Sequence, residues 1–119
     1  MDPLLLFRHE EDHVAFEAGA DLVREGDPAD RMYVIVEGRV RIHVKGKTLG
    51  ELGPGEIIGE VSLLDTRPRS ASATALEPTK AAAIDEKRFL FMIQNTPRFA
   101  LHVMKVMAER LRKDVDLIV

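Results

Sequence analysis

Residues 59–72 place an acid and an arginine nine positions apart, with apolar side chains between them and small residues after them. The acid is Glu60 and the arginine is Arg69. The intervening apolar side chains are Val61, Leu63 and Leu64. This pattern predicts one short helical turn with its apolar side against a core. Free N–H groups at the start of such a turn, beside one fixed cation, can bind an anion, and a nearby carboxylate can accept from hydroxyls. The segment therefore suits a sugar phosphate.

Three glycine-bounded motifs lead up to this segment. They are FEAG at 16–19, EGDPADRMYVIVEG at 25–38 and LGPGEIIGE at 52–60. In this order, and followed by residues 59–72, they resemble the cyclic nucleotide-binding domain family. That family includes catabolite activator proteins, protein kinase A regulatory subunits and cyclic-nucleotide-gated channels. The resemblance covers roughly residues 14–119, and residues 59–72 match the segment that the family calls its phosphate-binding cassette.

The resemblance implies roles for the two charges of the cassette. Arg69 would pair with the cyclic phosphate, for which a guanidinium offers two parallel N–H donors. Glu60 would accept from the ribose 2′-hydroxyl, and without ligand it could pair with Arg69 instead. Arg67 is expected to be solvated. The remaining predicted ligand-binding residues act through backbone N–H groups or small size: Gly59, Val61, Ser62, Ser70 and Ala71.

The purine base needs an apolar bed and a cover. Candidates for the bed, or for the core beneath it, are Val40, Ile42, Ile57 and Leu63. Candidates for the cap are Leu111, Val115 and Leu117 in the last helix. Ser70 could add a hydroxyl contact or favour guanine, so the residues leave cAMP and cGMP both open. We expect cAMP, from the broadly bacterial character of the chain.

Composition narrows the possible functions. The chain of 119 residues is 45% apolar, carries a net charge of −3 and contains no cysteine. These values fit one domain over residues 1–119, without disulfides or general affinity for nucleic acid, and suit a reducing cytoplasm. The apolar run 4–7 is too short for a membrane span or signal peptide.

Catalysis and metal binding are not expected. The sequence has no activated nucleophile, no Walker-type loop and no His-x-His pattern with a downstream acid. The four histidines are expected to be solvated: His9, His13, His43 and His102. No cofactor is expected beyond the nucleotide ligand, and the chain is not expected to be an enzyme.

Short alternating runs fill residues 14–84, after an N-terminal segment at 1–13. Glycines separate these runs, and the run 32–36 is apolar on both faces. The spacing predicts a mainly β fold, an antiparallel β-roll of the jelly-roll or double-stranded β-helix type. Residues 85–119 change to helical periodicity. Asp85 is the expected N-cap of a helix ending near Asn95, and a second helix is expected at 97–118.

The second helix carries two apolar stripes. The first consists of Phe99, Val103, Val106 and Met107. The second has near-heptad spacing and consists of Leu101, Met104, Ala108, Leu111, Val115 and Ile118. Both stripes could pack on this domain, or the second could form a homodimer, a lid over the ligand, or both.

Three functions remain open. The chain could be a cyclic-nucleotide sensor that signals to an unknown downstream protein through its last helix. It could be a protein-interaction domain of the same fold that responds to no nucleotide. It could also be the effector half of a transcription regulator whose helix-turn-helix is missing. Both a free-standing module and a fragment fit the sequence.

Overall fold

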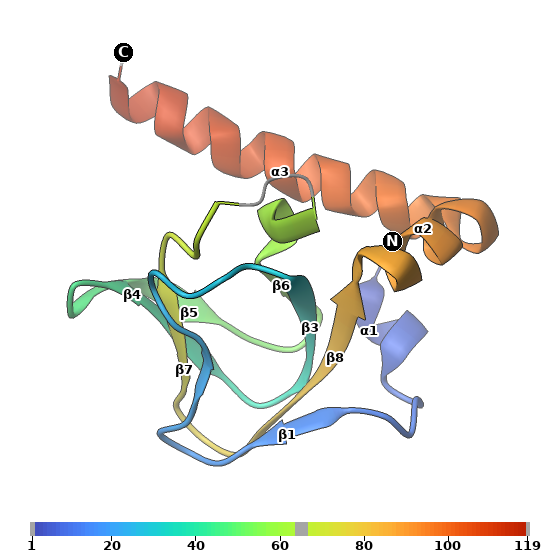
Figure 1. The fold of residues 1–119 in the computed structure, drawn as a ribbon, viewed down its shortest axis with the longest axis horizontal. Helices are drawn as coiled ribbons and strands as arrows, with labels where there is room; N and C mark the ends of the chain where they lie inside the picture. Colours follow the sequence, from blue (N-terminus) through green and yellow to red (C-terminus); the bar gives the residue numbers. More distant parts are fainter. Residues whose placement is uncertain (1, 64–66, 119) are drawn as a thin grey trace.

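Two antiparallel four-stranded sheets form the body of the protein in a computed structural model (Figure 1). The structure describes residues 2–63 and 67–118, without the side chains of 62–63 and 114–118. The first sheet has the order β1 (Val14–Phe16), β8 (Thr79–Asp85), β3 (Arg31–Glu37) and β6 (Ile57–Ile58). The second has the order β2 (Asp21–Val23), β7 (Ser72–Ala75), β4 (Val40–Val44) and β5 (Lys47–Leu52). The predicted antiparallel roll is confirmed.

Strand β3 lies between two apolar cores, which explains why its sequence is apolar on both faces. Met32 and Val34 point into a core shared with the helices. Tyr33 and Ile35 point to the opposite side, into the interior of the roll. Successive strand residues face opposite sides, so a strand covered on both faces needs a continuous apolar run. The four residues from Met32 to Ile35 are accordingly buried, with Tyr33 9% exposed.

Three α-helices accompany the roll: α1 (Pro3–Phe7), α2 (Glu86–Asn95) and α3 (Pro97–Ile118). The carboxylate of Asp85 accepts from the backbone N–H of Arg88, so the predicted N-cap of α2 is confirmed. Helix α3 crosses the top of the roll, and its C-terminal half extends beyond α2 toward β4 and β5 (Figure 1). Within the described part of the chain, no helix is long and apolar enough to cross a membrane.

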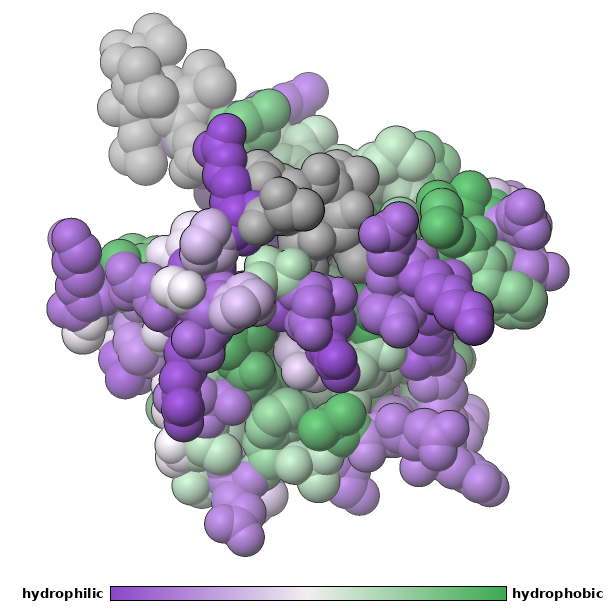
Figure 2. All heavy atoms as spheres, in the orientation of Figure 1, coloured by the Kyte–Doolittle hydropathy of each residue, from purple (hydrophilic) through white to green (hydrophobic). Residues whose placement is uncertain are grey.

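The first stripe of α3 anchors the helix to the roll. Phe99 and Val103 are fully buried, and the Phe99 ring meets that of Phe7 edge-on at 5.2 Å between centroids. In its described part, the second stripe does not pack on this domain, because Leu101 and Leu111 are each 65% exposed. Figure 2 shows exposed apolar atoms at the end of the molecule formed by α2 and the start of α3. The side chains of Val115 and Ile118 lie outside the described residues.

The cassette lies between β6 and β7, beneath α3. It begins with Gly59 and continues into a short 3-10 helix, η1 (Glu60–Leu63). The predicted helical turn is confirmed, although Leu64 and the side chain of Leu63 lie outside the described residues. Helix η1 contacts both β3 and α3, so the cassette is held between the roll and the last helix.

Candidate ligand-binding site

A turn far away in the sequence holds the backbone of Arg69. The Arg69 N–H donates to the Asp27 carbonyl at 2.9 Å, and the Gly26 N–H donates to the Arg69 carbonyl at 2.9 Å. Three residues further on, Ser72 Oγ accepts from the Glu25 N–H at 2.9 Å. The motif at 25–38 therefore has a structural purpose that the sequence did not reveal, because its first residues fix the end of the cassette.

The Arg69 side chain is buried against backbone rather than against an acid. Only 8% of it is exposed, and among the described carboxylates that of Asp30 lies 4.0 Å from Nη2. Nη2 donates to the Arg31 carbonyl at 2.7 Å. Nη1 lies against Gly59, where a Cβ atom would collide with it. Gly59 has a φ of +74°, so both its conformation and the space beside it favour glycine.

One donor of this guanidinium is left without a partner. Among the side chains that the structure describes, Arg69 Nη1 is the buried nitrogen that makes no hydrogen bond. Burial lowers the pKa of the Arg69 guanidinium below its usual range, and Tyr33 and Asp30 offset this only in part. The pKa of arginine is far above neutrality, so the group stays charged. A buried cation with an unused donor is a site for an anion.

Glu60 is buried and pairs with the last helix. It is 3% exposed, and its Oε2 accepts from Arg110 Nη1. Arg110 Nη2 donates to the Ile57 carbonyl at 2.8 Å. The ion pair between Glu60 and Arg69 that the sequence suggested for the ligand-free state is not formed. A carboxylate this deeply buried needs a cation, and α3 supplies one from the opposite side of the pocket.

Glu60 and Arg69 line one pocket of about 600 Å³. That volume lies within the usual range for small-molecule sites. Its cassette end contains every described residue of the predicted site: Gly59, Glu60, Val61, Arg69, Ser70 and Ala71. Its apolar end is lined by Val23, Ile42, Leu49, Leu52, Ile57 and Ala73. Two carboxylates also line the pocket: Glu51, which pairs with Arg39, and Glu56, which accepts from the Gly53 N–H. The predicted Ser62 belongs to η1, and its side chain lies outside the described residues.

The predicted bed for a base is present in part. Ile42 and Ile57 line the pocket, and Val40 is fully buried in the core, which is the alternative that the prediction allowed. Sequence reasoning missed Leu49 and Leu52, which lie on β5, where exposed residues obscure the alternation. The side chain of Leu63 is not described.

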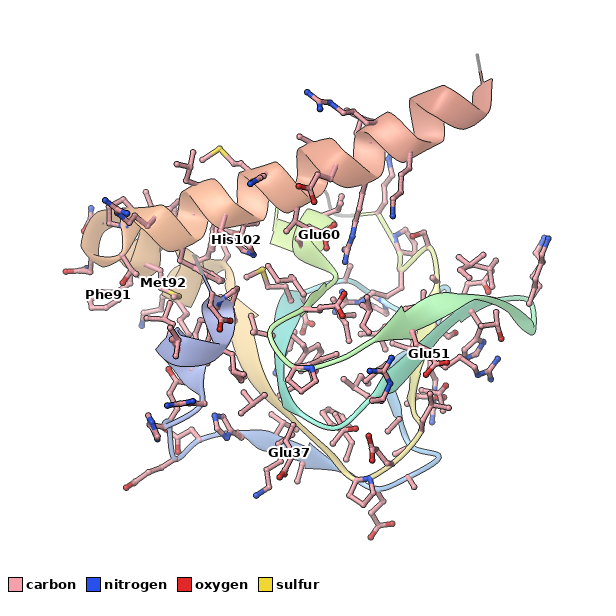
Figure 3. All side chains as sticks on the ribbon, turned by 180° about the vertical axis from the view of Figure 1, so that it is seen from behind. Glu37, Glu51, Glu60, Phe91, Met92 and His102 are labelled. Atoms are coloured by element: carbon pink, nitrogen blue, oxygen red, sulfur yellow. The ribbon has the colours of Figure 1, made fainter. Side chains whose placement is uncertain are left out.

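Among its described side chains, helix α3 presents cations to this pocket. Arg110 and Lys113 line it, and Leu111 does not. Figure 3 shows Glu60 directly beneath α3, where Arg110 reaches it. The side chains of Val115 and Leu117 lie outside the described residues. The sequence did contain a signal for Arg110, because it stands on the helix face of Val103, Val106 and Met107, which packs on the roll.

A second cavity of about 520 Å³ adjoins the first and shares Arg110 and Lys113 with it. It lies between the N-terminal segment and α3 and is lined by Asp2, His102 and Glu109 among others. Its charges are mixed, and within the described chain no buried polar atom is left unpaired there. The pocket that contains Arg69 is therefore the candidate site.

Three of the four histidines differ from the expectation of solvated side chains. His13 Nε2 lies 2.7 Å from the Phe7 carbonyl, and His43 Nε2 lies 2.8 Å from Thr74 Oγ1. His102 is half-buried beside α1. In each case the roll or a neighbouring helix folds back over a residue that looks exposed in the sequence. No cluster of potential metal ligands occurs among the described residues.

Comparisons with known proteins agree with this geometry. Residues 13–96 match the cyclic nucleotide-binding domain family. The cyclic AMP receptor protein of Thermus thermophilus is 38% identical over 108 residues, which are 86% of this chain and 50% of that protein. The crystal structure of the Thermus thermophilus catabolite activator protein superposes with a TM-score of 0.80 at 37% identity, covering 89% of this chain and 53% of that one.

A third similarity is to the EAL enzyme Bd1971. Its cAMP-bound form has a TM-score of 0.64 at 35% identity, covering 90% of this chain and 30% of that one. Its cGMP-bound form has a TM-score of 0.63 at 35% identity, covering 85% and 28%. The chain spans about half the length of the cyclic AMP receptor proteins that it matches. From the family match and the pocket around Arg69, we conclude that the chain belongs to the cyclic nucleotide-binding domain family.

Proposed function

We propose that this regulatory domain binds cAMP in the pocket around Arg69 and relays binding through the cassette and α3. The observation that carries the proposal is the buried and unpartnered Arg69 Nη1. A cyclic phosphate supplies the missing acceptor and a negative charge together. Bonds from a guanidinium to phosphate are among the stronger hydrogen bonds in proteins.

The ribose and the base follow from the position of the phosphate. Glu60 accepts from the ribose 2′-hydroxyl with one oxygen while Arg110 remains on the other. The base then occupies the apolar end, against Ile42 and Leu52. The resemblance of the chain to cyclic AMP receptor proteins supports cAMP as the ligand.

Arg110 gives the relay a physical link. It bonds to Glu60 in the cassette and to the Ile57 carbonyl on β6, so it connects α3 with two of the elements that line the pocket. A ligand that draws Glu60 toward its ribose changes the position that is best for Arg110. The helix would then have one position without ligand and another with it. A ligand shifts α3 between them only if its affinity for the protein differs between the two positions.

The outward stripe of α3 is proposed as a homodimer seam, by which binding reaches a downstream protein. Leu101, Met104 and Leu111 are all more than half exposed, at the spacing of a coiled-coil seam. A cytoplasmic location and the lack of any catalytic activity or cofactor are also proposals. They rest on the resemblance to regulators such as the cyclic AMP receptor proteins.

Calorimetric titration of the purified chain with cAMP tests the binding proposal. We expect micromolar or tighter affinity, and a loss on the order of 2–4 kcal/mol, or roughly 30- to 1000-fold, in Arg69→Ala. Arg67→Ala is the matched control, because Arg67 is an exposed arginine two positions away that does not line the pocket. Its affinity should stay within about threefold of the wild type.

Either of two results would overturn the proposal. Arg69→Ala with unchanged affinity would remove Arg69 from the phosphate site. If a folded wild-type chain binds neither cAMP nor cGMP, the remaining function is that of a protein-interaction domain, which has the fold of the family but responds to no nucleotide. An effector half of a transcription regulator would bind cAMP as proposed, and a helix-turn-helix encoded downstream would identify it.

A further inference from the structure

Two cations of α3 line the pocket, and only one of them is engaged. Arg110 uses one terminal nitrogen on Glu60 and the other on the Ile57 carbonyl. Lys113 also lines the pocket, but it has no hydrogen bond or ion pair with any residue whose side chain is described. The proposed function requires a phosphate cation and a ribose acceptor, and Arg69 and Glu60 supply them. The function gives no task to Lys113.

The position of Lys113 points to the base. It follows Arg110 by three residues, so both side chains lie on the same helix face, about 4.5 Å apart along the axis. Arg110 stands over Glu60, where the ribose is expected. The next turn of α3 extends toward β4 and β5, which line the apolar end of the pocket (Figure 1). The ammonium group of Lys113 can therefore reach the edge of a base bound there.

An ammonium group distinguishes the two purines. It offers three donors and no acceptor. Guanine presents two acceptors side by side, N7 and O6, whereas adenine presents the N7 acceptor beside an N6 donor. The ammonium can bond to both groups of guanine but meets a like donor at adenine N6. A lysine or arginine on guanine O6 and N7 is the commonest base-specific contact in protein–DNA complexes for the same reason.

We propose that Lys113 is a specificity-determining residue that favours guanine, so that cGMP competes with cAMP for this site. The proposal rests on the proposed function, because it assumes a cyclic nucleotide with its phosphate on Arg69. It concerns the ratio of the two affinities, and cAMP remains the expected ligand. General attraction of the phosphate by a positive charge would strengthen the binding of both nucleotides equally. Base recognition would instead change the ratio of the two affinities.

The test is calorimetric titration of the full chain with cAMP and with cGMP at one fixed salt concentration. Lys113→Gln should weaken cGMP binding about tenfold, a change within the range known for loss of a base contact. The same change should leave cAMP affinity within about threefold. Lys113→Glu, which offers an acceptor to adenine N6, should shift the preference further toward cAMP.

Lys105→Gln is the matched control. Lys105 is an exposed lysine of the same helix that lines neither cavity, so its replacement removes the same charge without touching the site. The ratio of cGMP to cAMP affinity should not change in this variant. Circular dichroism of each variant confirms that the helix is kept.

The outcomes separate this inference from the proposed function. If neither nucleotide binds to the wild type, the proposed function fails. If cAMP alone binds, or if both bind and Lys113→Gln weakens both equally or weakens neither, the function stands and the role of Lys113 is refuted. A selective loss of cGMP affinity in Lys113→Gln supports both the proposed function and the role of Lys113.

Discussion

The two arginines of the site, Arg69 and Arg110, have opposite environments. Arg69 is almost wholly buried, its backbone is clamped by the turn at 25–28, and one of its donors is unused. Arg110 is 41% exposed, stands on a helix that extends beyond the roll, and has both terminal nitrogens engaged. The difference separates two tasks. In the proposed function, the fixed arginine holds the ligand and the engaged arginine transmits its arrival.

The largest expected effect comes from disturbing the fixed arginine without replacing it. A valine in place of Gly59 would push against Arg69 Nη1, so Gly59→Val should lower cAMP affinity roughly 30-fold or more. Calorimetric titration measures this loss. Gly46→Val is the control, because Gly46 has a similar φ of +80° but nothing within 4 Å of its added Cβ.

Both glycine variants should lose stability from left-handed strain, by about 1–2 kcal/mol. Only Gly59→Val should also lose the ligand. Equal affinity in the two variants would mean that the position of Arg69 is not fixed by its contact with Gly59.

A smaller effect is expected from the engaged arginine. Arg110→Ala leaves the buried carboxylate of Glu60 without its cation, which should lower the free energy of unfolding by about 1–3 kcal/mol. Its cAMP affinity should fall less than that of Arg69→Ala. Urea denaturation gives the first quantity and titration gives the second.

Arg112→Ala is the control for this variant, since Arg112 is exposed on the same helix and lines neither cavity. It should change neither quantity. A loss of affinity in Arg110→Ala as large as in Arg69→Ala would remove the distinction between holding and transmitting.

The smallest expected effect is a pH dependence of the free energy of unfolding that arises from His102 on α3. Burial lowers the pKa of the His102 imidazole from 6.5, and the charge of Lys105 acts in the same direction, against the opposite effect of Glu109. Between this lowered value and 6.5 the unfolded chain binds more protons than the folded one. The free energy of unfolding should therefore decrease as the pH falls through this window.

His102→Gln should flatten that decrease, measured by urea denaturation at pH 7.5 and at points down to pH 5. An unchanged slope in the variant would assign the pH dependence to other groups. Because His102 lies on the buried half of α3, cAMP affinity of the variant should match that of the wild type. A loss there would mean that the anchored half of the helix also contributes to binding.

The roll and the cassette were predictable because their signals are local. Alternation identified the strands, Asp85 marked the start of α2, and the spacing from Glu60 to Arg69 marked the pocket. The partner of Glu60 was not predictable in the same way. Arg110 is fifty positions away, and although the periodicity of α3 places it on the inner face, nothing local identifies the carboxylate that it reaches. The support of Arg69 by the turn at 25–28 was missed for the same reason.

The predicted apolar cap shows a different limit. The periodicity of α3 correctly assigned Phe99 and Val103 to the inner face. It did not specify where the helix would cross the roll, and therefore which turn would stand over the pocket. The described α3 residues that line the pocket are Arg110 and Lys113. Leu111 does not line it, so its contact with the base stays a prediction. The crossing depends on packing among α1, α2 and β8, and one helix pattern does not contain that information.

The strand order also affects how this domain can fold while it is being synthesised. In each sheet the strand made last occupies an interior position: β8 lies between β1 and β3, and β7 lies between β2 and β4. A nascent chain that has emerged only as far as residue 71 has neither of these central strands. The strands that are made first therefore lack their hydrogen-bonding neighbours in the sheet until the last strands have been made. The backbone hydrogen bond between Asp27 and Arg69 likewise joins segments made at different times, so the candidate site is complete only after the later strands have been made.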